Sequence, residues 1–339
     1  MRSAGRSGRT AARLGLWMLL VAALGLTMGA AAGSTGWQAP WRVWQDPTVW
    51  PIVVEIRLPR SVGAWLAGAL LGLAGAVAQG VFRNPLADPF LLGSASGASL
   101  GVCLYLSLFG ASLALAWPWT VQLGMTGAAF VGALAAVLIT LTLSRGVQHT
   151  LRLLLAGVIV GVTLGAVTSW LSLLRPEVLR TMQGFMLGSA AWLDWAACLQ
   201  MALALLAGLI LSWPLARLLD ALSLGENTAR SLGLPVEAGR LFLVLVLALA
   251  TAAAVAKVGL VAFVGLAAPH AVRAVASLPH RHRVPLSACV GGNLLLLADV
   301  LARSLMAPQD LPVGLLTAAL GGGYLLLRLS RQQGGEAAA

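Results

Sequence analysis

The residues of this sequence that could do chemistry are few, and most of them are charged. Asp299 and Arg303 are four residues apart inside an apolar run, a spacing that places both on one face of a helix. A second group lies in the polar segment LDALSLGENTARSLGLPVEAGR (219–240), which separates two long apolar runs and carries Asp220, Glu226, Arg230, Glu237 and Arg240. Groups of opposite charge at these spacings form ion pairs, so the sequence predicts charged contacts rather than a catalytic centre.

No other pattern predicts catalysis or metal binding. Cys103, Cys198 and Cys289 each lie in an apolar stretch without the spacing of metal ligands. A P-loop needs a glycine-rich turn before its lysine, and Lys257, the single lysine, follows ATAAAVA, which contains no glycine. We therefore expect no metal site and no covalently bound cofactor. If the protein is driven by ATP, a separate chain must bind the ATP and Mg²⁺.

The composition indicates an integral membrane protein. Of the 339 residues, 59% are hydrophobic and 10% are charged, whereas soluble domains carry about 25% charged residues. The net charge of +11 comes mostly from arginines scattered between apolar runs, so it forms no basic stripe for nucleic acid. Enrichment of arginine on one side of a membrane explains this scatter better. We expect membrane lipid, and no nucleic acid, among the partners.

The apolar segments predict an all-α protein with about ten transmembrane helices, since a crossing needs roughly 20 apolar residues. The start of the chain also resembles a secretory signal, but the many later spans favour an uncleaved first helix. Breaks at polar, proline or glycine residues give candidate spans at 14–32, 61–82, 92–110, 120–143, 151–174, 192–213, 240–256, 259–278, 284–306 and 312–329.

The distribution of arginines predicts that both termini are cytoplasmic. In that orientation, the inner loops and helix ends hold roughly twice as many basic residues as the outer ones. The chain then consists of a cytoplasmic tail (1–13), a single transmembrane domain (14–329) and a second cytoplasmic tail (330–339). The polar segment becomes a cytoplasmic loop at about 215–239.

We interpret this loop as two short helices. The first ends near Leu224, and the second continues to Leu232. Gly225 and Gly233 stand where a left-handed residue would cap each helix, and Pro235 prevents further continuation.

The two short helices could serve as a docking element. Glu226 and Arg230 have the spacing of a helical ion pair. A small apolar face of this kind fits a groove on a partner protein. A helix lying on lipid headgroups explains the pattern about equally well, whereas a solvated loop leaves the paired glycines unexplained. The expected apolar face consists of Leu222, Leu224, Ala229 and Leu232.

Several stretches resemble sequences of one known family, and they follow one another in the same order as in that family. LDALSLGENTARSLGL resembles the cytoplasmic loop of the FecCD-type permeases, the membrane subunits of bacterial ABC importers for ferric siderophores, haem and vitamin B12. The other matching stretches are RLPRSVGAWLAGALLGLAGAVAQGVFRNPLADPFLLGSASGASLG (57–101), VGLVAFVGLAAPHAVR (258–273), LLLLADVLARSL (294–305) and DLPVGLLTAALGG (310–322).

The resemblance implies the FecCD/BtuC-like type II importer fold. It implies a homodimer in the bacterial inner membrane, two cytoplasmic ATP-binding subunits and a periplasmic substrate-binding protein. Outward-facing arginines, here Arg57, Arg60 and Arg303, would receive acidic residues of the binding protein. The residues that match the ATPase-coupling loop are Leu222, Ser223, Leu224, Gly225, Glu226, Thr228, Ala229 and Arg230.

The stretch 173–195 matches the place of a short gating helix in this family. Family members often carry Trp-x-x-Gly-Ser there, but this chain has Phe185-Met186-Leu187-Gly188-Ser189, so the tryptophan is replaced. Arg175 and Arg180 flank the region and would suit an anionic cargo, although ordinary interfacial arginines explain them as well. Phe185 and Met186 are further candidates for gate or cargo contacts.

The leading hypothesis is the translocation subunit of an importer for a bulky iron chelate, haem or a ferric siderophore. A vitamin B12 permease of the same family is the alternative. A secondary transporter driven by an ion gradient would need a carboxylate buried in mid-span, and Asp299 is the main candidate.

Overall fold

The computed structural model describes residues 2–33, 36–37, 50–113, 118–144 and 150–323, and this part of the chain is almost entirely helical. The predicted tail at 330–339 lies outside the described residues. The helices are α1 (Arg2–Ala31), α3 (Trp50–Ile52), the π-helical turn η1 (Val53–Arg57), α4 (Leu58–Phe82), the 3-10 turn η2 (Pro89–Leu92), α5 (Ser94–Leu113), α6 (Pro118–Leu143), α7 (Thr150–Leu174), α8 (Pro176–Leu187), α9 (Trp195–Ser212), α10 (Ala216–Ser223), α11 (Glu226–Ser231), α12 (Val236–Val258), α13 (Val264–Val275), α14 (His280–Ser304) and a last helix, Val313–Gly323.

The helices confirm the membrane-protein prediction, with one correction. Seven helices of the described ranges are long and apolar enough to cross a membrane, and Ser94–Gly110 and Val313–Gly323 are shorter apolar helices. The prediction of a full crossing at 259–278 is wrong. Helix α13 has 12 residues and spans about 18 Å, well short of the roughly 30 Å hydrocarbon core. The backbone turns just before α13, where Gly259 and Phe263 have positive φ angles of 70° and 68°.

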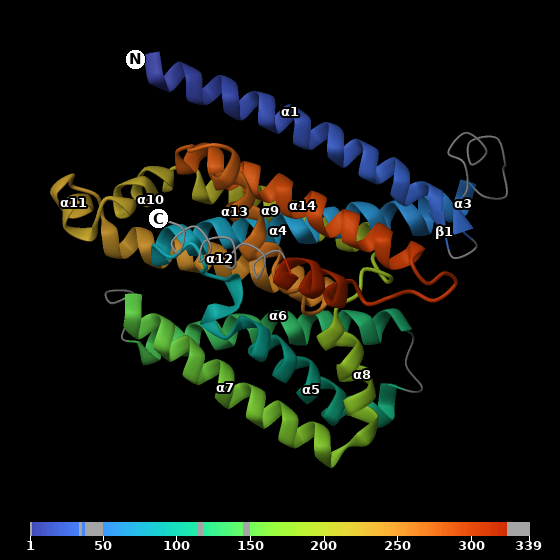
Figure 1. Ribbon diagram of the computed structural model, residues 1–339. Helices are drawn as coiled ribbons and strands as arrows, with labels where there is room; N and C mark the ends of the chain where they lie inside the picture. The colour runs from blue at the N-terminus through green and yellow to red at the C-terminus, as the bar shows by residue number, and fades with distance from the viewer. Residues whose placement is uncertain (1, 34–35, 38–49, 114–117, 145–149, 324–339) are drawn as a thin grey trace, which may run out of the picture.

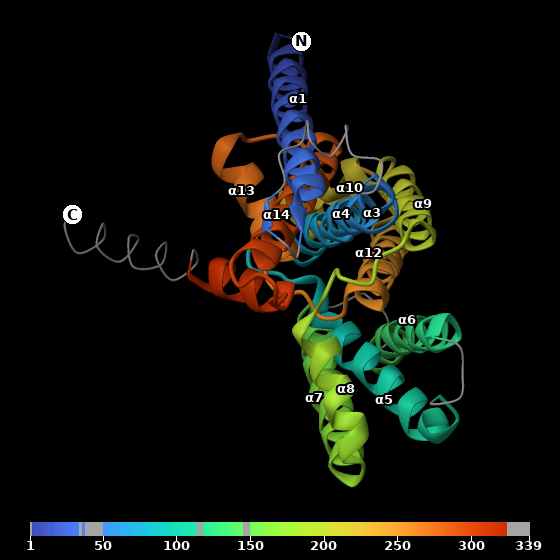
Figure 2. The same ribbon diagram turned by 90° about the vertical axis from the view of Figure 1, so that its right-hand side faces the viewer.

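Helix α4 forms the centre of the fold, and α9, α12, α13 and α14 pack around it (Figure 2). Its sequence supplies small residues where neighbours approach. A Cβ atom at Gly68 would collide with the carbonyl oxygen of Gly291, and one at Gly72 with that of Ser287. The two glycines therefore allow α4 and α14 to pack backbone against backbone, as small residues do between membrane helices.

Helices α5, α6, α7 and α8 form a second group beside this core, on the side away from α1 (Figure 2). Helix α1 runs along α14 and is continuous from Arg2, so the predicted tail at 1–13 is helical. The N-terminal end of α1 lies at the same end of the molecule as α10 and α11 (Figure 1). The opposite end carries α3 and the two-residue strands β1 (Ala32–Gly33) and β2 (Gly36–Trp37), which pair antiparallel.

Candidate functional site

The predicted pair of short helices exists, as α10 and α11, and it projects from the end of the molecule at which α1 begins (Figure 1). Its apolar residues divide between two environments, which corrects the expectation of one shared face. Leu222 and Ala229 are fully buried, whereas Leu224 and Leu232 are 72% and 64% exposed. Leu222 and Ala229 thus fix the pair to the core, and the other two leucines offer apolar surface at its tip.

The turn between the helices depends on Gly225. Its φ of 120° and ψ of 151° lie outside the left-handed helical region, so the expected left-handed cap is absent at this glycine. Gly225 is instead the N-cap residue of α11, in a conformation that residues with a side chain rarely adopt. Two hydroxyl groups brace the turn, because Ser223 donates to the carbonyl of Asp220 at 2.6 Å and Thr228 to that of Leu224 at 3.4 Å.

Glu226 is the electrostatic centre of α11. The expected pair with Arg230 is present, with 2.9 Å between Nη2 and Oε1. The second carboxylate oxygen, Oε2, accepts from Arg240 of α12 at 3.0 Å, and the side chain of Arg240 is 1% exposed. Burial raises the pKa of Glu226, but Arg240 and Arg230 outweigh this and hold that pKa below its ordinary value. A buried cation therefore anchors α11 to α12.

A second anchor joins α10 to α14, and it pairs Asp220 with His280, a residue that the sequence analysis did not select. Asp220 Oδ1 lies 2.6 Å from His280 Nδ1 and accepts from the His280 backbone N–H at 2.9 Å. Arg283 donates towards His280 Nε2 at 3.3 Å, so the proton on Nδ1 faces Asp220. Burial raises the pKa of Asp220, but the hydrogen bonds from His280 outweigh this and lower that pKa overall. These residues are 60 positions apart, and no local pattern indicates their pairing.

At the opposite end, the structure corrects the prediction that three arginines face outwards. Arg303 is 4% exposed and donates to Gly29 O at 3.1 Å and Ser61 Oγ at 3.0 Å. Arg57 is 8% exposed and donates to Ala30 O at 3.2 Å. The end of α1 covers both side chains, which explains their burial.

Arg60 is the most accessible of the three arginines, and two carboxylates hold it. Its Nε and Nη2 lie 3.0 Å from Asp299 Oδ1, and its Nη1 lies 2.6 Å from Asp310 Oδ2. Asp299 also pairs with Arg303 at 2.8 Å, as the four-residue spacing predicted. Asp299 is fully buried between two cations, which disfavours a role as an ion carrier.

The short helix expected between the fifth and sixth spans is α8. Arg175 precedes it and Arg180 lies on it, and both side chains are exposed. Met186 is 54% exposed, whereas Phe185 packs against a buried cluster around Met182 and Val255. Phe185 is therefore a packing residue in this structure, while the two arginines and Met186 are accessible.

Backbone hydrogen bonds fasten the C-terminal end of α8 to two other elements. The Leu260 N–H donates to Phe185 O at 3.1 Å, and the Ser189 N–H donates to Val258 O at 2.8 Å. The Val313 N–H donates to Gly188 O at 3.1 Å. The end of α8 is thus hydrogen-bonded to the segment that follows α12 and to the start of the last helix.

The comparisons with known proteins agree with this arrangement. The model of the FecCD transport family matches residues 17–331. The chain belongs to the FecCD transport family. It is 39% identical over 332 residues to the hemin transport system permease protein HmuU of Yersinia pestis, covering 96% of this chain and 98% of HmuU. It is 37% identical over 322 residues to the vitamin B12 import system permease protein BtuC of Escherichia coli, covering 93% and 96%. A solved inward-facing ABC transporter of the metal-chelate type has a TM-score of 0.81 at 26% identity, covering 94% of this chain and 99% of the other.

Family membership fixes the role of the chain. A FecCD permease is the membrane-spanning translocation subunit of an ABC importer and not itself an enzyme, and it resides in the inner membrane as a multi-pass protein. Such permeases work with an ATPase and a substrate-binding protein.

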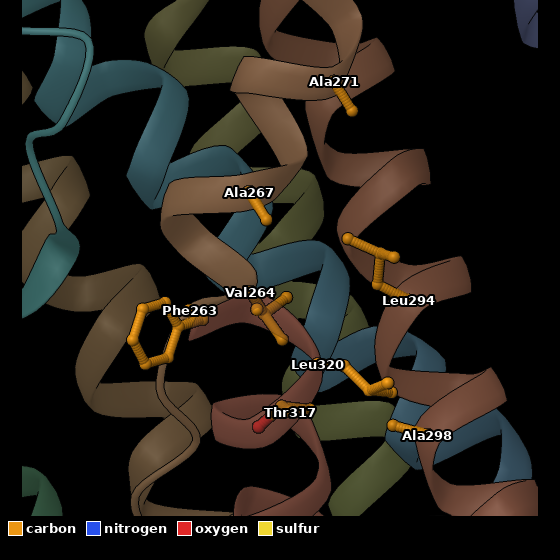
Figure 3. A pocket seen from close by; sticks show the side chains of 9 residues that line it. Phe263, Val264, Ala267, Ala271, Leu294, Ala298, Thr317 and Leu320 are labelled. Carbon is orange, nitrogen blue, oxygen red and sulfur yellow. The ribbon is translucent and has the colours of Figure 1, made fainter. Parts of the chain in front are cut away.

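This FecCD permease contains an apolar cavity of about 290 Å³ between α13, α14 and the last helix (Figure 3). Its polar side chain, Thr317, already donates to Gly314 O at 3.0 Å. The volume lies at the lower limit of small-molecule sites, so the cavity of a single subunit does not form a specific site for a bulky chelate. In the described ranges, no group of three or more His, Cys, Asp or Glu residues could hold a metal ion.

Proposed function

We propose that this chain imports an iron chelate, haem or a ferric siderophore, from the periplasm to the cytoplasm. Two copies form the pathway, two ATPase subunits that use ATP and Mg²⁺ bind at the inner end, and a periplasmic binding protein delivers the cargo at the outer end. The observation that carries the proposal is the exposed tip of α10 and α11, where Leu224 and Leu232 project from helices anchored to the core by Leu222 and Ala229.

This tip has the properties of a mechanical contact. Its exposed leucines offer apolar area to a groove, which is a common way for one protein to hold a short helix of another. The residues Leu222, Ser223, Leu224, Gly225, Glu226, Thr228, Ala229 and Arg230 would make or support this contact. The Glu226–Arg240 and Asp220–His280 contacts would pass a displacement of the tip to α12 and α14.

The iron-chelate cargo is supported by the HmuU relative and by the exposed arginines of α8. Arg175 and Arg180 would attract the carboxylates of haem or of an acidic siderophore. The corrinoid alternative is kept because BtuC is almost as similar as HmuU, at 37% against 39% identity. Binding energy spread over few contacts suits a pathway that must release its cargo.

The proposal is tested by reconstituting the permease, its ATPase and its binding protein in liposomes. Uptake of haem, a ferric siderophore and cyanocobalamin is measured with ATP inside, and separately with an ion gradient and no ATP. We expect ATP-dependent uptake of an iron chelate. Uptake of cyanocobalamin alone would select the corrinoid alternative, and uptake driven by the gradient would contradict the importer mechanism.

The contact at the tip is tested by the double substitution Leu224→Asp and Leu232→Asp. Both side chains are exposed, so the variant should fold and elute as a single species in size-exclusion chromatography. It should lose binding of the ATPase and transport. Leu222→Asp, which places a carboxylate at a fully buried position, should instead reduce the yield of folded protein. Normal transport by the folded double variant would refute the coupling role.

A further inference from the structure

An accessible carboxylate lies at the end of the molecule opposite α10 and α11 and pairs with Arg60. Asp310 lies in the exposed segment between α14 and the last helix, and its side chain is 41% exposed. It contacts Nη1 of Arg60 at 2.6 Å, while the Nε and Nη2 edge of the same guanidinium faces Asp299. Arg60 therefore has one buried acidic partner and one accessible acidic partner.

The charges of this cluster balance only when Asp310 is included. Arg60 and Arg303 contribute two positive charges, and Asp299 neutralises one of them. Asp299 is fully buried and Arg303 is 4% exposed, so neither can be exchanged from outside. Removing Asp310 from Arg60 would leave one uncompensated positive charge at the rim, which is the condition for capturing another carboxylate.

From this geometry we propose that Asp310 is an internal latch that an acidic side chain of the periplasmic binding protein displaces from Arg60. The inference rests on the proposed docking of a binding protein at this end, and it commits to a carboxylate of that protein as the occupant. Charge complementarity indicates a carboxylate, because the group that replaces Asp310 must carry the same negative charge at Nη1 of Arg60.

The neighbouring residues suit a protein partner. Leu305 and Met306, at the start of the same segment, are 59% and 53% exposed. Methionine and arginine are both enriched in protein interfaces relative to the rest of the surface. A partner that covers both and inserts a carboxylate at Arg60 would bury apolar area and keep the cluster neutral.

The segment that carries Asp310 is also connected to α8 by backbone hydrogen bonds. Asp310 is three residues before Val313, whose N–H donates to Gly188 O at the end of α8. The segment is held to α14 by the Leu311 N–H, which donates to Ala302 O at 3.2 Å. Release of Asp310 would free the segment at Arg60 and leave its backbone connection to α8 in place, so docking would be communicated to the gating helix.

The test is the affinity of the cognate binding protein for the permease–ATPase complex in nanodiscs, measured by biolayer interferometry at low and at physiological salt. Asp310→Asn removes the carboxylate that competes for Arg60 and should raise the affinity for the binding protein roughly fivefold at low salt. This factor corresponds to the largest effect usually measured for an accessible ion pair. Asp310→Glu keeps the charge and should stay near the wild-type value. Glu55→Gln removes another exposed outer carboxylate and should change the affinity by less than about twofold.

The variant Arg60→Gln distinguishes docking at Arg60 from the latch role of Asp310. If docking uses Arg60, this variant binds more weakly, and adding Asp310→Asn to it restores nothing. Weaker binding by Arg60→Gln together with unchanged or weaker binding by Asp310→Asn would overturn the latch and leave the docking site intact. Unchanged binding by Arg60→Gln would overturn docking at Arg60 itself.

Discussion

The contact between Glu226 and Arg240 should hold α11 in place much more strongly than the contact between Glu226 and Arg230. Both arginines reach the same carboxylate at nearly equal distances, 3.0 Å and 2.9 Å. They differ in exposure, because the Arg240 side chain is 1% exposed and the Arg230 side chain 53%. Replacing each arginine with glutamine in turn compares the stabilisation from the buried ion pair with that from the solvated one.

The expected energies follow from this exposure. Breaking a fully buried ion pair costs about 3–5 kcal/mol. Glu226 is 24% exposed and keeps Arg230, so water and the remaining cation relieve part of that cost, and we expect about 2 kcal/mol for Arg240→Gln. For Arg230→Gln the cost should be about 0.5 kcal/mol, as for other exposed helical pairs.

Hydrogen exchange measures this difference directly in the full-length protein. The amides of Ala229, Leu232 and Leu234 are bonded to carbonyl oxygens within 225–234, so they exchange when this segment opens. Since about 1.4 kcal/mol corresponds to a factor of ten, exchange should accelerate about 30-fold in Arg240→Gln and about twofold in Arg230→Gln. Amides in the middle of α9 should be unaffected in both.

Equal acceleration in the two variants would refute the reasoning, because burial would then not decide which arginine anchors α11. Acceleration of α9 as well would indicate general destabilisation instead of a local anchor. In liposomes, the ATPase subunits bound to Arg240→Gln should also hydrolyse more ATP for each cargo molecule imported than those bound to Arg230→Gln.

Two further predictions concern the same anchor and the packing of α4. The pKa of folded Glu226 is lowered, so protection of the α11 amides should be constant above about pH 4.3, the ordinary Glu value. Protection should be lost as the pH falls through the lower pKa of the folded state. Constant protection well below that folded-state pKa, after correction for the intrinsic exchange rate, would contradict this prediction. Gly72→Leu forces a side chain against the Ser287 carbonyl and should abolish folded, monodisperse protein. Gly127→Leu should be tolerated, because no atom lies within 4 Å of the Cβ position at Gly127. Equal yields of the two variants would contradict the close packing of α4 and α14.

The sequence was most informative where the structure is determined locally. The apolar runs defined most membrane helices, and the spacing of Gly225, Glu226, Arg230 and Gly233 was enough to place α10 and α11. The length of α13 could not be predicted, because 259–278 is apolar throughout most of its length. Its early break depends on Phe263 adopting a positive φ, which nothing in a phenylalanine indicates.

Contacts between distant segments were the main source of error at the site. The resemblance placed Arg57 and Arg303 outside, but carbonyl oxygens of Ala30 and Gly29 from α1 bind them. Asp220 and His280 pair across 60 residues, and each looks like an ordinary polar loop residue in the sequence. Such pairings follow from how the helices pack, and helix periodicity contains no information about them.

The backbone hydrogen bonds at the end of α8 do not depend on the tryptophan that family members often carry at position 185. Position 185 is phenylalanine, yet the contacts that fasten α8 to α12 and to the last helix use the backbone atoms of Phe185, Gly188 and Ser189. A side-chain substitution leaves these hydrogen bonds unchanged. Helix α12 extends about 35 Å over its 23 residues, from Arg240, which is paired with Glu226 of α11, to Val258 beside α8. Because both ends of α12 are held by contacts that do not involve the side chain at 185, we expect substitutions at this position to leave the connection from α11 through α12 to α8 intact.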